Sequence, residues 1–200
     1  MAYDKLPSGE TKVGFVSQHF ERLFGISKMG IPLPTLRVFF RESSFVLPSE
    51  SDVPVTMIGP GCGVAPFRAF LQEKQCLSLK NEMSLYFGCR HSCKDYLYKE
   101  EFQNFCENGT LNNYSTAFSR EGDQVVYVQD KLEENMDKVL EDLLEKNGVI
   151  FMCGSLRMGK SVTEKISNAI ASKLSLDENG LYQKMKELEK GKQIIKELWG

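Results

Sequence analysis

A glycine-rich turn between a short apolar run and a helical pattern is the segment of the sequence best suited to chemistry. It spans residues 55–67, with Gly59, Gly61 and Gly63 in the turn and Pro66 at the start of the helical pattern. Glycines permit a tight turn and leave backbone N–H groups open to a phosphate, which the positive end of the helix dipole also attracts. No Lys-Ser or Lys-Thr pair follows, so the turn is not a P-loop. Taken alone, it fits a phosphate cradle and a merely tight strand-to-helix turn equally well.

The ends of the next two apolar runs carry cationic and hydroxyl side chains. Arg90 follows one run, and Ser119 and Arg120 follow the other, with Tyr127 a few residues on. An NAD site usually has an acid after its second strand, whereas cations there suit the 2′-phosphate of NADP. Arginine and serine suit a phosphate, and a tyrosine ring can stack on adenine. Either arginine alone is most simply a solvated surface charge, but two beside a phosphate turn favour an NADP site.

A cysteine and a glycine end the fourth apolar run. Gly154 lets the backbone approach a ligand closely. No histidine is placed in the sequence to pair with Cys153, which disfavours covalent catalysis. A buried structural cysteine is the common alternative, and a role in positioning a nicotinamide is the functional one.

Alternating short apolar runs and helical patterns position these residues. The expected strands are 55–58, 83–87, 114–118, 149–153 and 193–199, and the expected helices are 66–76, 96–106, 128–145, 158–174 and 180–190. Such alternation is typical of βα units. The sequence therefore predicts an α/β fold with about five parallel strands and helices on both faces.

Composition excludes several classes of protein. With 200 residues, 42% hydrophobic and 26% charged, the chain resembles ordinary globular proteins. A net charge of −2 gives no general reason to bind nucleic acid or an anionic membrane. Six cysteines without a signal peptide favour reduced thiols and a cytoplasmic location. Only two histidines are present, and the closest cysteines, Cys89 and Cys93, are too poorly spaced for a metal site.

The first 52 residues differ in texture from the rest. Glycines and prolines interrupt them, and residues 36–40 form one strand-like run. On its own this segment has too few strands to close a barrel or sandwich. We divide the chain at 52, because the alternating pattern begins at about residue 53. Residues 53–200 are the expected nucleotide-binding domain.

Seven short motifs, in matching order and spacing, resemble the C-terminal FAD/NADPH reductase half of the diflavin reductases. This family includes cytochrome P450 reductase, the nitric oxide synthase reductase region, sulfite reductase flavoprotein and methionine synthase reductase. The motifs are IGPGCGVAPF at 58–67, YFGCR at 86–90, DYLY at 95–98, FSRE at 118–121, YVQ at 127–129, CG at 153–154 and LW at 198–199. The resemblance implies a ferredoxin-NADP reductase-type nucleotide-binding domain, preceded in residues 1–52 by a remnant of the FAD-binding barrel domain and its link.

The resemblance also implies roles for individual residues. The glycine turn with Cys62 would hold the NADPH pyrophosphate, with Arg90 nearby. The adenosine 2′-phosphate site would comprise Ser119, Arg120, Tyr127 and Gln129. Cys153 would lie near the nicotinamide, Trp199 would stack over the flavin, and Glu197 stands where the family usually has an aspartate. Gly14 and Ser17 belong to a motif similar to the one that binds the FAD pyrophosphate.

The activity implied is that of an NADPH-dependent flavoprotein oxidoreductase, transferring hydride from NADPH to FAD and electrons onward through FMN to an acceptor such as a heme protein. The partners implied are the FAD and FMN domains of a longer parent chain, without which we expect the isolated chain to be inactive. Cys62, Val125 and Ser155 depart from the family's usual threonine, lysine and aspartate. The alternative is therefore a nucleotide-binding or regulatory module without efficient electron transfer.

Overall fold

The computed structural model describes residues 3–5, 8–50, 52–122 and 124–200, in two compact units. The N-terminal unit is Met1–Glu42 and the sheet unit is Ser43–Gly200. This division falls ahead of the boundary predicted after residue 52. Whether the predicted boundary separates two functional domains stays a prediction.

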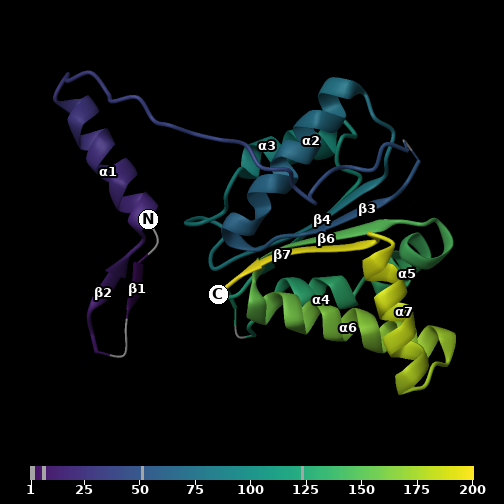
Figure 1. Ribbon diagram of the computed structural model, residues 1–200. Coiled ribbons are helices and arrows are strands. Elements are labelled where there is room, and N and C mark those ends of the chain that lie inside the picture. Colours follow the sequence, from purple (N-terminus) through teal and green to yellow (C-terminus); the bar gives the residue numbers. More distant parts are fainter. Residues whose placement is uncertain (1–2, 6–7, 51, 123) are drawn as a thin grey trace. The chain divides into compact units, whose positions relative to one another are not determined.

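Five parallel strands form the centre of the sheet unit. They are β3 (Val55–Ile58), β4 (Met83–Cys89), β5 (Asn113–Phe118), β6 (Val149–Ser155) and β7 (Ile194–Trp199). Their order across the sheet is β5-β4-β3-β6-β7, and every neighbouring pair is parallel (Figure 1). The predicted α/β fold is confirmed, with each strand within two residues of its expected ends.

Helices cover both faces of this sheet (Figure 1). One face carries α2 (Ala65–Leu77) and α3 (Lys99–Glu107), and the other carries α4 (Val128–Glu133), α5 (Met136–Glu145), α6 (Leu156–Leu174) and α7 (Glu178–Lys190). Side chains of a strand point alternately to the two faces. In β6, Phe151 and Cys153 accordingly pack in the α2/α3 core, and Ile150 and Met152 in the core on the other side.

Two predicted helices are shorter than expected. The pattern at 128–145 breaks between α4 and α5, where the Asn135 side chain donates to the carbonyl of Lys131 at 3.1 Å. The expected helix at 96–106 begins only at Lys99, because Tyr98 has a left-handed φ of 57°. Apolar periodicity indicates where these helices lie, but it does not reveal the side chain and the backbone conformation that interrupt them.

The N-terminal unit contains an antiparallel pair of strands, β1 (Tyr3–Lys5) and β2 (Thr11–Val13), and one helix, α1 (Phe15–Lys28). Helix α1 is not among the helices expected from the sequence, although Val16, Phe20 and Phe24 recur at helical spacing. The expected strand at 36–40 is wrong: this segment forms no strand in the part of the chain that the structure describes, and Phe40 is 99% exposed. A strand needs a hydrogen-bonding partner, and apolar composition alone does not supply one.

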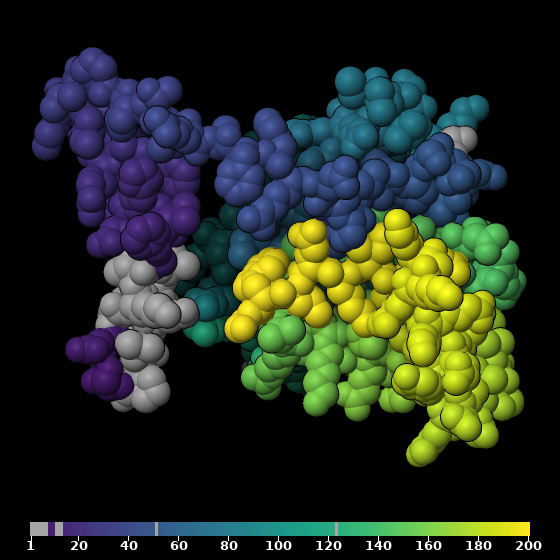
Figure 2. Space-filling view, in the orientation of Figure 1, coloured from purple at the N-terminus to yellow at the C-terminus, as the bar shows by residue number. Residues whose placement is uncertain are grey.

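Residues 43–50, here called the junction strap, are the first segment of the sheet unit and lie beside β7 (Figure 2, strap in blue and β7 in yellow). The Phe45 ring lies 6.0 Å from that of Phe67 and 5.2 Å from that of Phe151. The buried side-chain amide of Asn81 donates to the carbonyl of Glu50 at 2.8 Å. The strap is therefore anchored at both ends to the α2/α3 side of the sheet.

Within the described residues, none of the helices combines the length and apolar character needed to cross a membrane.

Candidate nucleotide-binding site

A cavity of about 700 Å³ opens at the carboxyl ends of the strands. Strands β4 and β5 follow β3 on one side of it in the sheet, whereas β6 and β7 lie on the other side of β3. The cavity thus lies at the point where strand order reverses, which is where open α/β sheets bind ligands. Its volume is in the usual range for small-molecule sites.

The cavity brings together eight of the predicted site residues. They are Gly61, Cys62, Arg90, Ser119, Tyr127, Gln129, Gly154 and Trp199. The predicted residues of the sheet unit that do not line it are Gly59, Gly63, Arg120, Cys153 and Glu197. Gly14 and Ser17 belong to the N-terminal unit, at the first turn of α1. Their predicted role stays a prediction.

The three glycines of the turn have different tasks. The turn is a short 3-10 helix, η1 (Gly61–Val64), which runs directly into α2. Gly61 has a φ of 56° and open space where a Cβ would stand, so it exposes backbone to the cavity. A Cβ on Gly63 would lie 2.1 Å from the carbonyl oxygen of Cys153, and one on Gly59 would lie 2.5 Å from the carbonyl oxygen of Gly63. Gly59 and Gly63 therefore let the turn pack on itself and on β6.

Backbone hydrogen bonds continue past the ends of β4 and β5 and hold Arg90 beside Ser119. The N–H of Ser119 donates to the carbonyl of Cys89 at 3.0 Å, and that of Arg120 to the carbonyl of Arg90 at 3.0 Å. Although Arg120 does not line the cavity, its backbone is thus fixed next to the lining residue Ser119. The backbone segments that carry Arg90, Ser119 and Arg120 are therefore adjacent.

The Asp95 carboxylate shapes the loop after β4. It accepts backbone hydrogen bonds from His91 at 2.7 Å and from Arg90 at 3.1 Å. These two hydrogen bonds lower the pKa of Asp95 below its ordinary value, and the bond from His91 has the larger effect. Hydrogen bonds to the ionised form favour it. Asp95 lines the cavity, and its carboxylate oxygens accept the hydrogen bonds that hold the backbone of Arg90 and His91.

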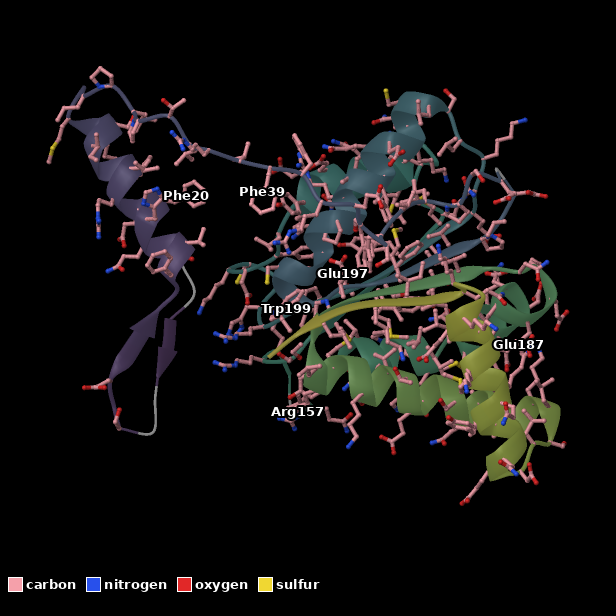
Figure 3. All side chains as sticks on the ribbon, viewed as in Figure 1. Phe20, Phe39, Arg157, Glu187, Glu197 and Trp199 are labelled. Carbon is pink, nitrogen blue, oxygen red and sulfur yellow. The ribbon has the colours of Figure 1, made fainter. Side chains whose placement is uncertain are left out.

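Arg157 is a cationic lining residue that the sequence interpretation did not select. It lies in the first turn of α6, at the same end of the sheet as Trp199 (Figure 3). Ser155 caps this helix, its hydroxyl oxygen accepting from the N–H of Met158 at 3.2 Å. The sequence pattern predicts a helix that starts only at 158, one residue after Arg157. The Ser155 cap signal places the helix start correctly and would have found it.

Cys153 and Glu197 occupy paired positions of β6 and β7. Cys153 is 5% exposed, and burial, followed by the nearby Glu197 carboxylate and then Cys62, raises its pKa to about 11. The Cys153 side chain is therefore a neutral thiol at neutral pH and a poor nucleophile. Trp199 follows at the end of β7 and is 46% exposed.

These features suit a phosphate-bearing nucleotide. The cavity is lined by two guanidinium groups, Arg90 and Arg157, by a hydroxyl at Ser119 and by Gly61, and the Tyr127 ring is half-exposed at its wall. Guanidinium groups bind phosphate oxygens with strong charge-assisted hydrogen bonds. The residues present therefore fit NADPH.

Fold and cavity together define a nucleotide-binding α/β domain with its site at the strand switch point. Residues 57–164 match the family described as "Oxidoreductase NAD-binding domain", and the chain belongs to this family. Its similarity to the NADPH-binding region of the diflavin reductases, expected from the sequence motifs, is confirmed.

Several curated relatives match most of the chain. NADPH oxidoreductase A of Dictyostelium discoideum is 37% identical over 96% of the chain, and NADPH–cytochrome P450 reductase of Musca domestica is 32% identical over 96%. Methionine synthase reductase of Mus musculus is 33% identical over 83%. The chain spans 29%, 29% and 26% of the lengths of these three relatives.

Proposed function

We propose that this chain is the NADPH-binding module of a flavoprotein reductase, presenting the nicotinamide of NADPH so that hydride passes to FAD. The observation that carries the proposal is the cavity at the strand switch point, lined by Arg90, Ser119, Tyr127 and Arg157. It is supported by relatives whose names describe them as NADPH oxidoreductases and NADPH–cytochrome P450 reductases.

Each part of the site has a distinct task in this proposal. Ser119, Arg120, Tyr127 and Gln129 hold the adenosine end, with the 2′-phosphate at the arginine and serine. Gly61, Cys62 and Arg90 hold the pyrophosphate. NADPH supplies the hydride and FAD accepts it, while the protein contributes orientation and electrostatics. The neutral Cys153 thiol, Glu197 and Trp199 border the nicotinamide end.

The proposed partners are an FAD domain and an FMN domain, with a heme protein or a similar acceptor downstream. The proposed compartment is the cytoplasm. All six cysteines lie in the described part of the chain, and each is a free thiol. Free thiols are typical of a reducing compartment.

Calorimetric titration of the 200-residue chain with 2′-AMP and with 5′-AMP tests the nucleotide assignment. Hydrogen bonds to charged groups contribute about 1.5–3 kcal/mol, so 2′-AMP should bind at least about tenfold more tightly. Equal affinities, or no binding of either nucleotide, would overturn the NADPH assignment.

A second candidate is a regulatory module that binds the nucleotide without efficient electron transfer. It is favoured by Cys62, which lines the cavity where the family usually has a threonine and which offers only a weak donor. Fusing the chain to the proposed FAD and FMN partner domains and measuring NADPH-driven ferricyanide reduction separates the two candidates. Robust turnover eliminates the regulatory one.

A further inference from the structure

The Glu197 carboxylate has a hydrogen-bond partner far away in the sequence. The hydroxyl of Ser43 donates to Oε1 of Glu197, with the two oxygens 3.3 Å apart. Ser43 is the first residue of the sheet unit, and Glu197 lies in its last strand, β7. Figure 3 shows Glu197 near the carboxyl end of β7, close to Trp199.

The Ser43 hydroxyl is itself oriented by the strap. Its oxygen accepts a hydrogen bond from the N–H of Phe45 at 3.0 Å. A serine hydroxyl has one proton to donate and lone pairs to accept with. Since the Phe45 N–H occupies a lone pair, the proton is free to point toward the Glu197 carboxylate.

Aromatic packing fixes the strap that carries Ser43. The Phe45 ring contacts three phenylalanine rings, those of Phe67, Phe70 and Phe151, at centroid distances of 6.0, 6.2 and 5.2 Å. Phe151 lies in β6, two residues before Cys153. The strap therefore packs against β6, the strand of Cys153, through Phe45. Its Ser43 hydroxyl donates to Glu197 of β7.

We propose that Ser43 is a positioning residue, which holds the Glu197 carboxylate beside the Cys153 thiol at the nicotinamide end of the site. The inference rests on the proposed function for the role of Glu197 and Cys153, but the arrangement itself can be tested without any nucleotide. Without the Ser43 hydroxyl, the exposed Glu197 side chain is free to turn toward water and away from Cys153.

Titration of the Cys153 thiol reports the position of this carboxylate, because Glu197 contributes to the raised pKa of Cys153. The experiment follows the carbon-13 signal of the cysteine Cβ atoms with pH in the 200-residue chain, the Cys153 signal being assigned with Cys153→Ser. A titration midpoint, unlike an alkylation rate, is independent of how easily a reagent reaches the buried thiol. We expect Ser43→Ala and Glu197→Gln each to shift the midpoint below about 11.

Three further variants make the result specific. Ser43→Ala combined with Glu197→Gln should give the same midpoint as Glu197→Gln alone, because the serine acts only through the carboxylate. Ser43→Thr keeps the hydroxyl, so its Cys153 titration midpoint should equal that of the wild-type chain. Ser44→Ala, which removes a hydroxyl one residue away, is the matched control and should leave it unchanged.

The proposal is overturned if Ser43→Ala leaves the Cys153 midpoint unchanged, or lowers it equally when Glu197 is already glutamine. A fall that Ser44→Ala reproduces also overturns it, since the strap would then act by general loosening. Affinity for 2′-AMP is measured in parallel. If the wild-type chain does not bind 2′-AMP but Ser43→Ala still lowers the Cys153 titration midpoint, the proposed function is contradicted and the positioning role is supported.

Discussion

At the scale of residues, the two cavity-lining arginines come from different elements, one from the loop after β4 and one from the first turn of α6. The sequence predicted Arg90 because it directly follows an apolar run. It did not predict Arg157, because the exposure of that side chain to the cavity depends on where α6 begins and on the packing of β6 against β3.

Replacing Arg90 or Arg157 with alanine should weaken NADPH binding by about tenfold or more, since each removes a charge-assisted hydrogen bond worth about 1.5–3 kcal/mol. Fluorescence titration with NADPH measures the dissociation constant. Arg68→Ala is the charge-matched control, because Arg68 pairs with Glu101 and does not line the cavity. Comparable losses in all three variants would show that net charge, and not position, governs binding.

Cys153 should make the chain less stable at alkaline pH. The thiol keeps its proton up to about pH 11 in the folded chain, whereas its ordinary pKa is 9.0. Between these values the folded state binds more protons than the unfolded state, so the free energy of unfolding falls as pH rises. Urea unfolding at pH 8, 9 and 10 should show this fall, and Cys153→Ser should reduce its slope. Cys89, whose pKa is also about 11, accounts for part of the remainder. Identical slopes in the two chains would contradict the burial of the thiol.

At the scale of elements, the five strands could be predicted because buried parallel strands are short continuous apolar runs bounded by turn residues. The N-terminal unit was harder. Its helix α1 carries apolar side chains at helical spacing, but among its described residues it buries only Leu23, so the interrupting glycines and prolines of this segment outweigh the periodicity in a sequence-based prediction. The sequence predicts the glycine turn. It does not predict that Gly63 packs against β6 while Gly61 has open space beside it, because that difference depends on contacts with residues far away in the sequence.

Gly63→Ala should destabilise the sheet unit more than Gly61→Ala does. The new Cβ at 63 would meet the Cys153 backbone of a central strand, which cannot move freely, and such overpacking costs up to about 3 kcal/mol. At 61 the Cβ meets nothing within 4 Å, and only the left-handed backbone conformation costs about 1 kcal/mol. Urea unfolding of both variants measures the difference. Equal losses would mean that η1 does not pack on β6 as described.

At the scale of the whole molecule, both hydrophobic cores consist of residues from the sheet unit alone. A chain of residues 43–200 should therefore fold independently and bind 2′-AMP with an affinity within about twofold of that of the 200-residue chain, because truncation removes no residue of either core. Circular dichroism and calorimetry check the two parts of this prediction. Loss of cooperative unfolding after truncation would show that the N-terminal unit supports the sheet.

The strand order also has a kinetic consequence. β3 pairs with β4 and β4 with β5 over short stretches of chain, and β6 pairs with β7, but β3 and β6 join across the greatest sequence separation of any strand pair in this sheet. Long-range parallel pairing is slow, because loop-closure entropy must be overcome before the contacts form. The nucleotide cavity is lined from both sides of that junction. During folding, the ability to capture a nucleotide should therefore arise only when the two halves of the sheet meet, so a bound nucleotide slows unfolding without speeding the earlier steps of assembly.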